Sequence, residues 1–171
     1  MDKKNDKVSF LYASLKEAQD NIRTYDTKAQ IVGIGYIFTI SMLTKLMDMS
    51  FLHSNVILTS LEYFLMLAPI VLFASVLYPT RKLAPSILRN RNNVKGMYYP
   101  NPNDIDSVDS FINMIDDINI KDELAYELLK VSVLRDLKRK RFLRALLFAS
   151  LSLLALLILQ ILLMNKIPLS L

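Results

Sequence analysis

Carboxylates in one short region are the first groups that could do chemistry, and their spacing does not suit catalysis. Asp116 and Asp117 are adjacent, so on a helix their side chains point about 100° apart and make a poor acid–base pair. Asp104, Asp106 and Asp109 match a calcium-binding loop only faintly, because no glycine and no closing glutamate follow at the required positions. Asp104, Asp106 and Asp109 fit better a solvated loop and the start of a helix.

Other catalytic and metal-binding groups are scarce. The chain of 171 residues has no cysteine and one histidine, His53, so disulfides, thiolate zinc sites and cysteine nucleophiles are excluded. The sequence contains no glycine-rich phosphate loop, no HExxH motif and no serine nucleophile elbow. We therefore predict that the protein is not an enzyme, binds no metal ion and needs no cofactor.

The composition indicates a membrane protein. The hydrophobic fraction is 53%, the mean hydropathy is +0.30 and there are three glycines, which is unusual for a soluble protein with many loops. Three apolar runs, 29–47, 56–78 and 143–164, approach the roughly 17–25 residues that cross a hydrocarbon core. Lys45 and Glu62 lie near the ends of the first two runs, where they either pair or snorkel independently. The alternative is a soluble bundle with three core helices, but the third run lacks a polar stripe.

Lysine and arginine residues in the short flanks predict the orientation of these spans. They gather before the first span, after the second and before the third, where "RDLKRKRFLR" has six basic residues in ten. The N-terminus and residues 80–141 are therefore predicted to be cytoplasmic, as parts of a multi-pass membrane protein. The "KRKR" segment at 138–141 fits membrane-flanking charge better than a nucleic-acid patch.

Two soluble regions are predicted on the cytoplasmic side. Residues 1–28 form an amphipathic helix that continues into the first span, with an apolar face of Phe10, Leu11, Leu15, Ala18 and Ile22. Residues 80–141 begin with a proline-rich stretch that excludes long helix. A short helix is predicted from about Ser107, and a second one is predicted to begin near Asn119 and run without a breaker to Met164. The predicted fold is an all-α membrane protein with three transmembrane helices and a cytosolic helical cluster continuous with them. Ala29 and Gly33 form a small-residue pair that allows close helix approach.

The segment "NIRTYDTKAQIVGIGYIFTI" resembles the N-terminal signature of Pycsar effector membrane proteins. In that family an Asn, then an Asp-x-Lys-Ala, leads into the first span, and here these residues are Asn21, Asp26, Lys28 and Ala29. The resemblance continues, in the family's order, at "LYPTRK", at the aromatic segment "KGMYYPN" and at "LLKVSVLRDLKRKRFLRAL" before the last span. Pro100 departs from the family, which more typically has an aromatic residue there.

The resemblance implies a bacterial antiphage effector. A partner nucleotide cyclase would sense infection and make cCMP or cUMP, and the effector would bind this ligand in the cytosol, oligomerise and impair the inner membrane. The alternatives are an effector that answers a different nucleotide second messenger, and a membrane scaffold protein without a ligand. A small transporter or channel fits less well, because the third span carries few polar groups.

The ligand implied by the resemblance indicates the candidate site residues. A cyclic nucleotide needs a cation for its phosphate and an aromatic face for its base. The candidates that would supply these groups or hydrogen-bond the base and ribose are Asn21, Arg23, Asp26, Lys28, Arg81, Tyr98, Tyr99 and Arg135. The alternative for each is an interhelical or lipid-headgroup contact, and Asp26 and Lys28 would then pair between neighbouring helices.

Overall fold

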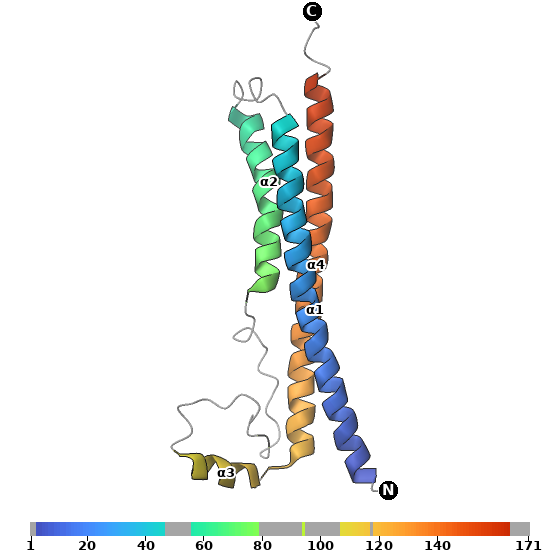
Figure 1. Ribbon diagram of the computed structural model, residues 1–171, viewed down its shortest axis with the longest axis vertical. Coiled ribbons are helices and arrows are strands. Elements are labelled where there is room, and N and C mark those ends of the chain that lie inside the picture. The colour runs from blue at the N-terminus through green and yellow to red at the C-terminus, as the bar shows by residue number, and fades with distance from the viewer. Residues whose placement is uncertain (1–2, 47–55, 79–93, 95–106, 117, 165–171) are drawn as a thin grey trace, which may run out of the picture. The chain divides into compact units, whose positions relative to one another are not determined.

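The computed structural model describes residues 3–46, 56–78, 94, 107–116 and 118–164 of the chain. Within those ranges it contains four helices and no strand (Figure 1). The helices are α1 (Lys3–Leu46), α2 (Val56–Leu77), α3 (Val108–Asp116) and α4 (Ile120–Met164). The predicted all-α class is confirmed, and so are the two long uninterrupted helices, α1 and α4.

The start of α4 shows how a local signal sets a helix boundary. The side-chain oxygen Oδ1 of Asn119 accepts a hydrogen bond from the backbone N–H of Lys121 at 3.3 Å, and its amide nitrogen donates to Asp122 Oδ2 at 3.0 Å. An asparagine in this position satisfies a backbone N–H that has no partner inside the helix. The predicted N-cap at Asn119 is confirmed, and α3 begins one residue after Ser107 as its sequence indicates.

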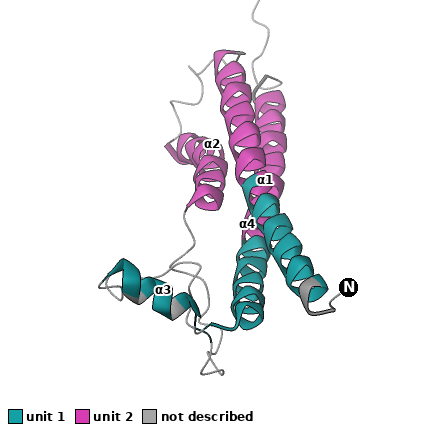
Figure 2. Cartoon of the chain, turned by 60° about the horizontal axis from the view of Figure 1, so that its bottom comes forward, with its two compact units in different colours: residues 1–23, 79–137 teal, residues 24–78, 138–171 magenta. Residues whose placement is uncertain are grey.

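The chain divides into two compact units, coloured separately in Figure 2. Unit 1 comprises residues 1–23 and 79–137, and unit 2 comprises residues 24–78 and 138–171. Both α1 and α4 contribute residues to each unit, whereas α2 belongs to unit 2 and α3 to unit 1.

Unit 1 has a small apolar core between its parts of α1 and α4. Its buried members are Leu15 and Ala18 of α1 with Leu124 and Val131 of α4, each no more than 5% exposed. Their spacing of three or seven residues is that of helices packing along one face. The predicted face of α1 is thus confirmed at Leu15 and Ala18. It is wrong at Phe10, which is 68% exposed.

Unit 2 packs three helical segments together. In this unit α1 and α4 run in the same direction and α2 runs in the opposite one (Figure 1). Its core is larger and consists of Ala29, Tyr36, Ile40, Met66, Phe73, Val76, Phe142, Ala145, Ala149 and Leu156. A Cβ added at Gly33 would meet the Cβ of Phe73 at 3.4 Å, so the missing side chain lets α1 and α2 approach closely. The prediction for the small-residue pair is confirmed.

Among the residues that the structure describes, two helices are long and apolar enough to cross a membrane. They are Val56–Leu77, with a mean hydropathy of 2.1, and Ile120–Leu162, with 2.6 in its most apolar window. Only 22% of each apolar window is buried inside the chain. A core helix of a soluble protein would be mostly buried, so these exposed apolar faces are suited to lipid. The remaining predicted span is residues 29–47, of which residues 29–46 lie in α1. That this segment crosses a membrane stays a prediction.

Candidate functional site

A heptad spacing along α4 brings a charged residue into the interior. Leu124, Val131, Lys138, Ala145 and Ser152 follow one another at seven-residue steps, and each is buried. Lys138 is 7% exposed at a position where its neighbours in the series are small or apolar. A buried ammonium group is strongly unfavourable unless it is paired, so the packing of α4 requires an anionic partner here.

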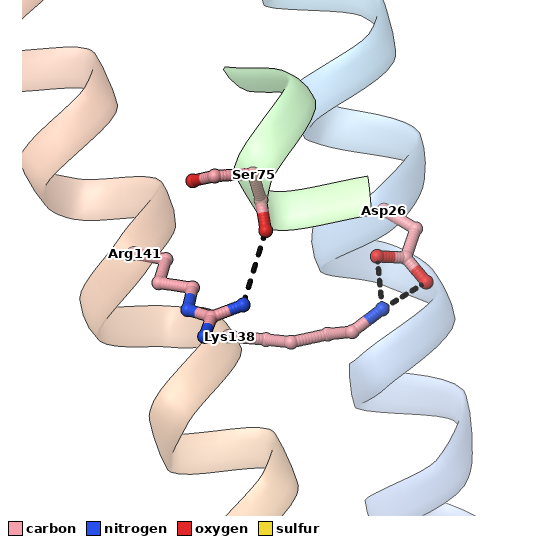
Figure 3. Close-up of polar contacts among 4 residues, drawn as sticks. All are labelled: Asp26, Ser75, Lys138 and Arg141. Carbon is pink, nitrogen blue, oxygen red and sulfur yellow. Dashed lines mark hydrogen bonds and ion pairs between the residues drawn. The ribbon is translucent and has the colours of Figure 1, made fainter. Parts of the chain in front are cut away.

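That partner is Asp26 of α1, within unit 2 (Figure 3). The Nζ atom of Lys138 donates to both carboxylate oxygens, and its distance to Oδ2 is 2.6 Å. The Lys138 side chain is 8% exposed and that of Asp26 is 32% exposed. A charge-assisted pair shielded from water in this way is stronger than a surface pair and fixes the helices that carry it.

A second cation joins α4 to α2. Arg141 lies one turn after Lys138, and its Nη1 donates to the backbone carbonyl of Ser75 at 3.1 Å (Figure 3). This carbonyl is in the last turn of α2, and the residue four positions on is Pro79, which has no N–H to donate. The guanidinium therefore satisfies a carbonyl that the helix cannot, at the helix end where a cation is favoured.

We call Asp26, Ser75, Lys138 and Arg141 the polar clasp. Through these contacts α4 is bonded to α1 by Lys138 and to α2 by Arg141, so the clasp holds all three helices of unit 2 at one level. These bonds hold the three helices in one relative position. Each bond joins two helices and breaks if either helix rotates or slides by about one residue, since hydrogen bonds weaken steeply with distance and angle.

Aromatic rings pack beside the clasp. Phe142 follows Arg141 in sequence, and its ring lies 6.1 Å from that of Tyr25 and 6.5 Å from that of Phe73. Phe142 is 8% exposed and Phe73 is 3% exposed. Three rings from three helices therefore exclude water from the interior side of the clasp. Low local polarity strengthens the polar bonds that are made and raises the cost of losing one partner.

The predicted site residues have different surroundings. Asp26 is in the clasp, so its contact is with Lys138 and not with Lys28, which is exposed. Arg23 is exposed, and its Nη1 lies 3.8 Å from Oδ1 of Asp20 on the same helix.

The other predicted residues divide into two groups. Arg135 of unit 1 donates to the adjacent Asp136 from Nε at 3.2 Å and from Nη2 at 3.1 Å. Asn21 is half-buried on α1. Arg81, Tyr98 and Tyr99 lie outside the described residues, so their placement near the ligand stays a prediction.

Sequence reasoning missed Lys138 and Arg141. Both belong to the "KRKR" segment, which was interpreted as membrane-flanking charge. Lys138 is buried and bonded to Asp26, and the membrane-flanking position of the segment stays a prediction. The signal was present, because Lys138 lies seven residues from both Val131 and Ala145. In the described part of the chain, no group of three or more His, Cys, Asp or Glu side chains could hold a metal ion.

Comparison with known families bears on this arrangement. The chain matches the model of the Pycsar effector protein domain over residues 10–165. No curated protein and no solved structure matches the chain. The matched range includes every residue of the clasp and of both helical cores.

Proposed function

This chain belongs to the Pycsar effector family, and from that premise we propose that it is a membrane effector gated by a cyclic pyrimidine mononucleotide, cCMP or cUMP. The observation that carries the proposal is the family match over residues 10–165, nearly the whole chain, which supports a role in bacterial antiphage defence. The proposed role is not enzymatic and needs no cofactor. A partner nucleotide cyclase supplies the ligand.

The proposed target is the bacterial inner membrane. The exposed apolar faces of α2 and α4 support lipid contact, and we propose that residues 29–47 form a further span, with the N-terminus in the cytoplasm. Three helices packed around an apolar core enclose no wide pore. The proposed damage therefore requires several copies of the chain, so the active form is a homo-oligomer.

We propose that the nucleotide contacts residues of unit 1. Arg23 and Arg135 are bonded to acids on the same helix, at three residues' distance and one. Exposed pairs of this kind contribute about 0–1 kcal/mol, so a phosphate can take the place of the carboxylate. Asn21 offers a group that hydrogen-bonds a base or a ribose, and Arg81, Tyr98 and Tyr99 complete the proposed set. Lys28 belongs to unit 2, so its role as a further cation stays a prediction from the sequence. The carboxylate of Asp26 is engaged in the clasp.

The free energy of the clasp bonds determines how strongly a ligand must prefer the open form. A ligand shifts an equilibrium only by the difference between its affinities for the two states. If opening of the unit 2 helices breaks one clasp bond that contributes about 2 kcal/mol, the ligand must prefer the open form by roughly 30-fold to offset it. Preferences of this size are ordinary for regulated proteins.

The test is dye leakage from liposomes that carry the purified protein, with cCMP, cUMP, cAMP and cGMP added separately. Leakage with only one pyrimidine nucleotide is expected, and binding of the same nucleotide is expected by calorimetry. Arg23→Gln and Arg135→Gln should weaken binding, whereas Lys16→Gln, also at an exposed position on the unit 1 part of α1, should not. Folded protein that binds none of the four nucleotides would overturn the proposal and favour another messenger or a scaffold role.

A further inference from the structure

A proline inside α2 frees a backbone carbonyl in the interior of unit 2. Pro69 has no N–H, so the carbonyl of Leu65, four residues earlier, lacks its helical donor. Two side chains from the other helices take this role. The Tyr36 hydroxyl of α1 donates to the Leu65 oxygen at 3.0 Å, and the Ser152 hydroxyl of α4 donates to the same oxygen. Tyr36 is 4% exposed and Ser152 is 1% exposed.

The oxygen atoms of Tyr36, Ser152 and Leu65 make more contacts with one another than they have protons to donate. The hydroxyls of Tyr36 and Ser152 are 3.1 Å apart, so the cluster has three oxygen–oxygen contacts. Each hydroxyl has one proton and the carbonyl has none, so one contact lacks a proton at any moment. The cluster therefore has spare acceptor capacity. Oxygen lone pairs can replace the hydration shell of a cation, whereas both hydroxyl protons are donated to the Leu65 carbonyl and are not available to an anion.

A carboxyl group lies one turn before Leu65 in α2. Glu62 is 2% exposed and falls on the same helix face as the buried residues Met66, Pro69 and Phe73. A carboxyl in a membrane-spanning helix is costly, and groups of this kind commonly mark ion pathways. The Glu62 carboxyl adds two more oxygens to the same interior face.

We propose that Glu62, the Leu65 carbonyl, Tyr36 and Ser152 form an oxygen-lined cation site in the interior of unit 2. When copies of the chain assemble and the helices of unit 2 separate, water enters this interior and monovalent cations such as K⁺ pass along it in preference to anions. The inference rests on the proposed membrane function and deepens it by naming the ion class. Membrane damage would then consist first of a loss of the cation gradient.

Ion selectivity tests the role of Glu62. The reversal potential is measured in planar bilayers under a KCl gradient with cCMP or cUMP added. The wild-type current should reverse near the K⁺ potential, and Glu62→Gln should lower the K⁺ over Cl⁻ permeability ratio about tenfold, since the carboxylate supplies the field that favours cations. Ser60→Ala, a change on an exposed part of the same helix, is the control and should leave the ratio unchanged. A current whose selectivity Glu62→Gln does not alter would overturn the inference and leave the proposed gating intact.

Water access tests the pathway without relying on a current. Because the chain has no cysteine, Glu62→Cys can be probed with membrane-impermeant cationic and anionic methanethiosulfonate reagents. Labelling is measured without nucleotide and with each of the four nucleotides. Both reagents should react at this position once the pathway holds water, because the substitution itself removes the carboxylate that favours cations, and Leu61→Cys, at an exposed apolar position, should react with neither.

The labelling outcomes separate the two proposals. Labelling of Glu62→Cys combined with silence of every nucleotide would support the pathway and overturn nucleotide gating. No labelling in any condition would overturn the pathway even if dye leaks, provided that Lys140→Cys, an exposed site on α4, is labelled in the same preparation.

Discussion

Unit 1 and unit 2 both pack α1 against α4, but they fill the interface differently. In unit 1 the buried contacts between the two helices include Leu15, Ala18, Leu124 and Val131. In unit 2 the heptad series of α4 continues with Lys138, Ala145 and Ser152. The heptad positions of α4 are thus large and apolar in unit 1 (Leu124 and Val131) and small or polar in unit 2 (Lys138, Ala145 and Ser152).

This difference matches the solvent that each unit is expected to meet. In water, burial of apolar surface drives helices together at about 25 cal/mol per Å². In lipid that driving force between helices is absent, and close packing of small residues and interhelical hydrogen bonds take its place. Unit 2 has both, with Gly33 against Phe73 and the clasp between three helices. We conclude that unit 1 is held mainly by burial and unit 2 mainly by specific contacts.

The largest expected effect is in the unit 1 core. Leu124 is 1% exposed, and Leu124→Ala should lower the free energy of unfolding by about 3 kcal/mol through lost burial and the cavity left behind. Leu129→Ala is the matched control on the same helix, because Leu129 is 57% exposed. Urea titration of the protein in detergent, followed by circular dichroism, measures both. Equal effects of the two changes would mean that unit 1 is not held by this core.

A smaller effect is expected at the clasp. Asp26→Ala leaves the Lys138 ammonium buried without its carboxylate, and it should cost about 2 kcal/mol, less than for a fully buried pair because Asp26 is one-third exposed. The double change Asp26→Ala with Lys138→Met should recover most of this loss, since no buried charge remains. Thermal unfolding of the four proteins in this cycle measures the coupling. Additive effects would show that the pair does not stabilise unit 2.

Much of this fold could be predicted from sequence because local signals set it. The uninterrupted apolar and helix-forming runs indicated α1 and α4, and Asn119 indicated the start of α4. The site was harder to predict. Sequence alone showed that Asp26 precedes an apolar run, but the choice between Lys28 and Lys138 as its partner depends on how helical segments 112 residues apart are rotated.

The positions of two prolines identify backbone carbonyls that need a donor from another helix. Pro69 and Pro79 each lie four residues after a carbonyl that another helix then satisfies, at Leu65 and Ser75. Sequence identifies such carbonyls directly, because a proline cannot donate to the fourth residue before it. The identity of the donors cannot be read in this way. It requires the packing of α1 and α4 around α2, which is a property of the whole unit.

The smallest and most specific effect is expected at the Leu65 carbonyl. Because Tyr36 and Ser152 both donate to this oxygen, Tyr36→Phe alone or Ser152→Ala alone should cost only about 0.5 kcal/mol, the usual size of an interhelical hydrogen bond in a membrane. The double change should cost more than the sum, about 1–2 kcal/mol, because the carbonyl is then buried without a donor.

The single and double changes at Tyr36 and Ser152 should also be compared in a protein that carries Pro69→Ala. Alanine restores the N–H that the Leu65 carbonyl lacks, so the double change should lose its excess cost there. Unfolding measured in bicelles for the eight combinations gives the coupling with and without the proline. If the excess persists in the Pro69→Ala background, the hydroxyls stabilise unit 2 through their contact with each other, and the carbonyl freed by Pro69 is not the reason that two polar side chains occupy the interior.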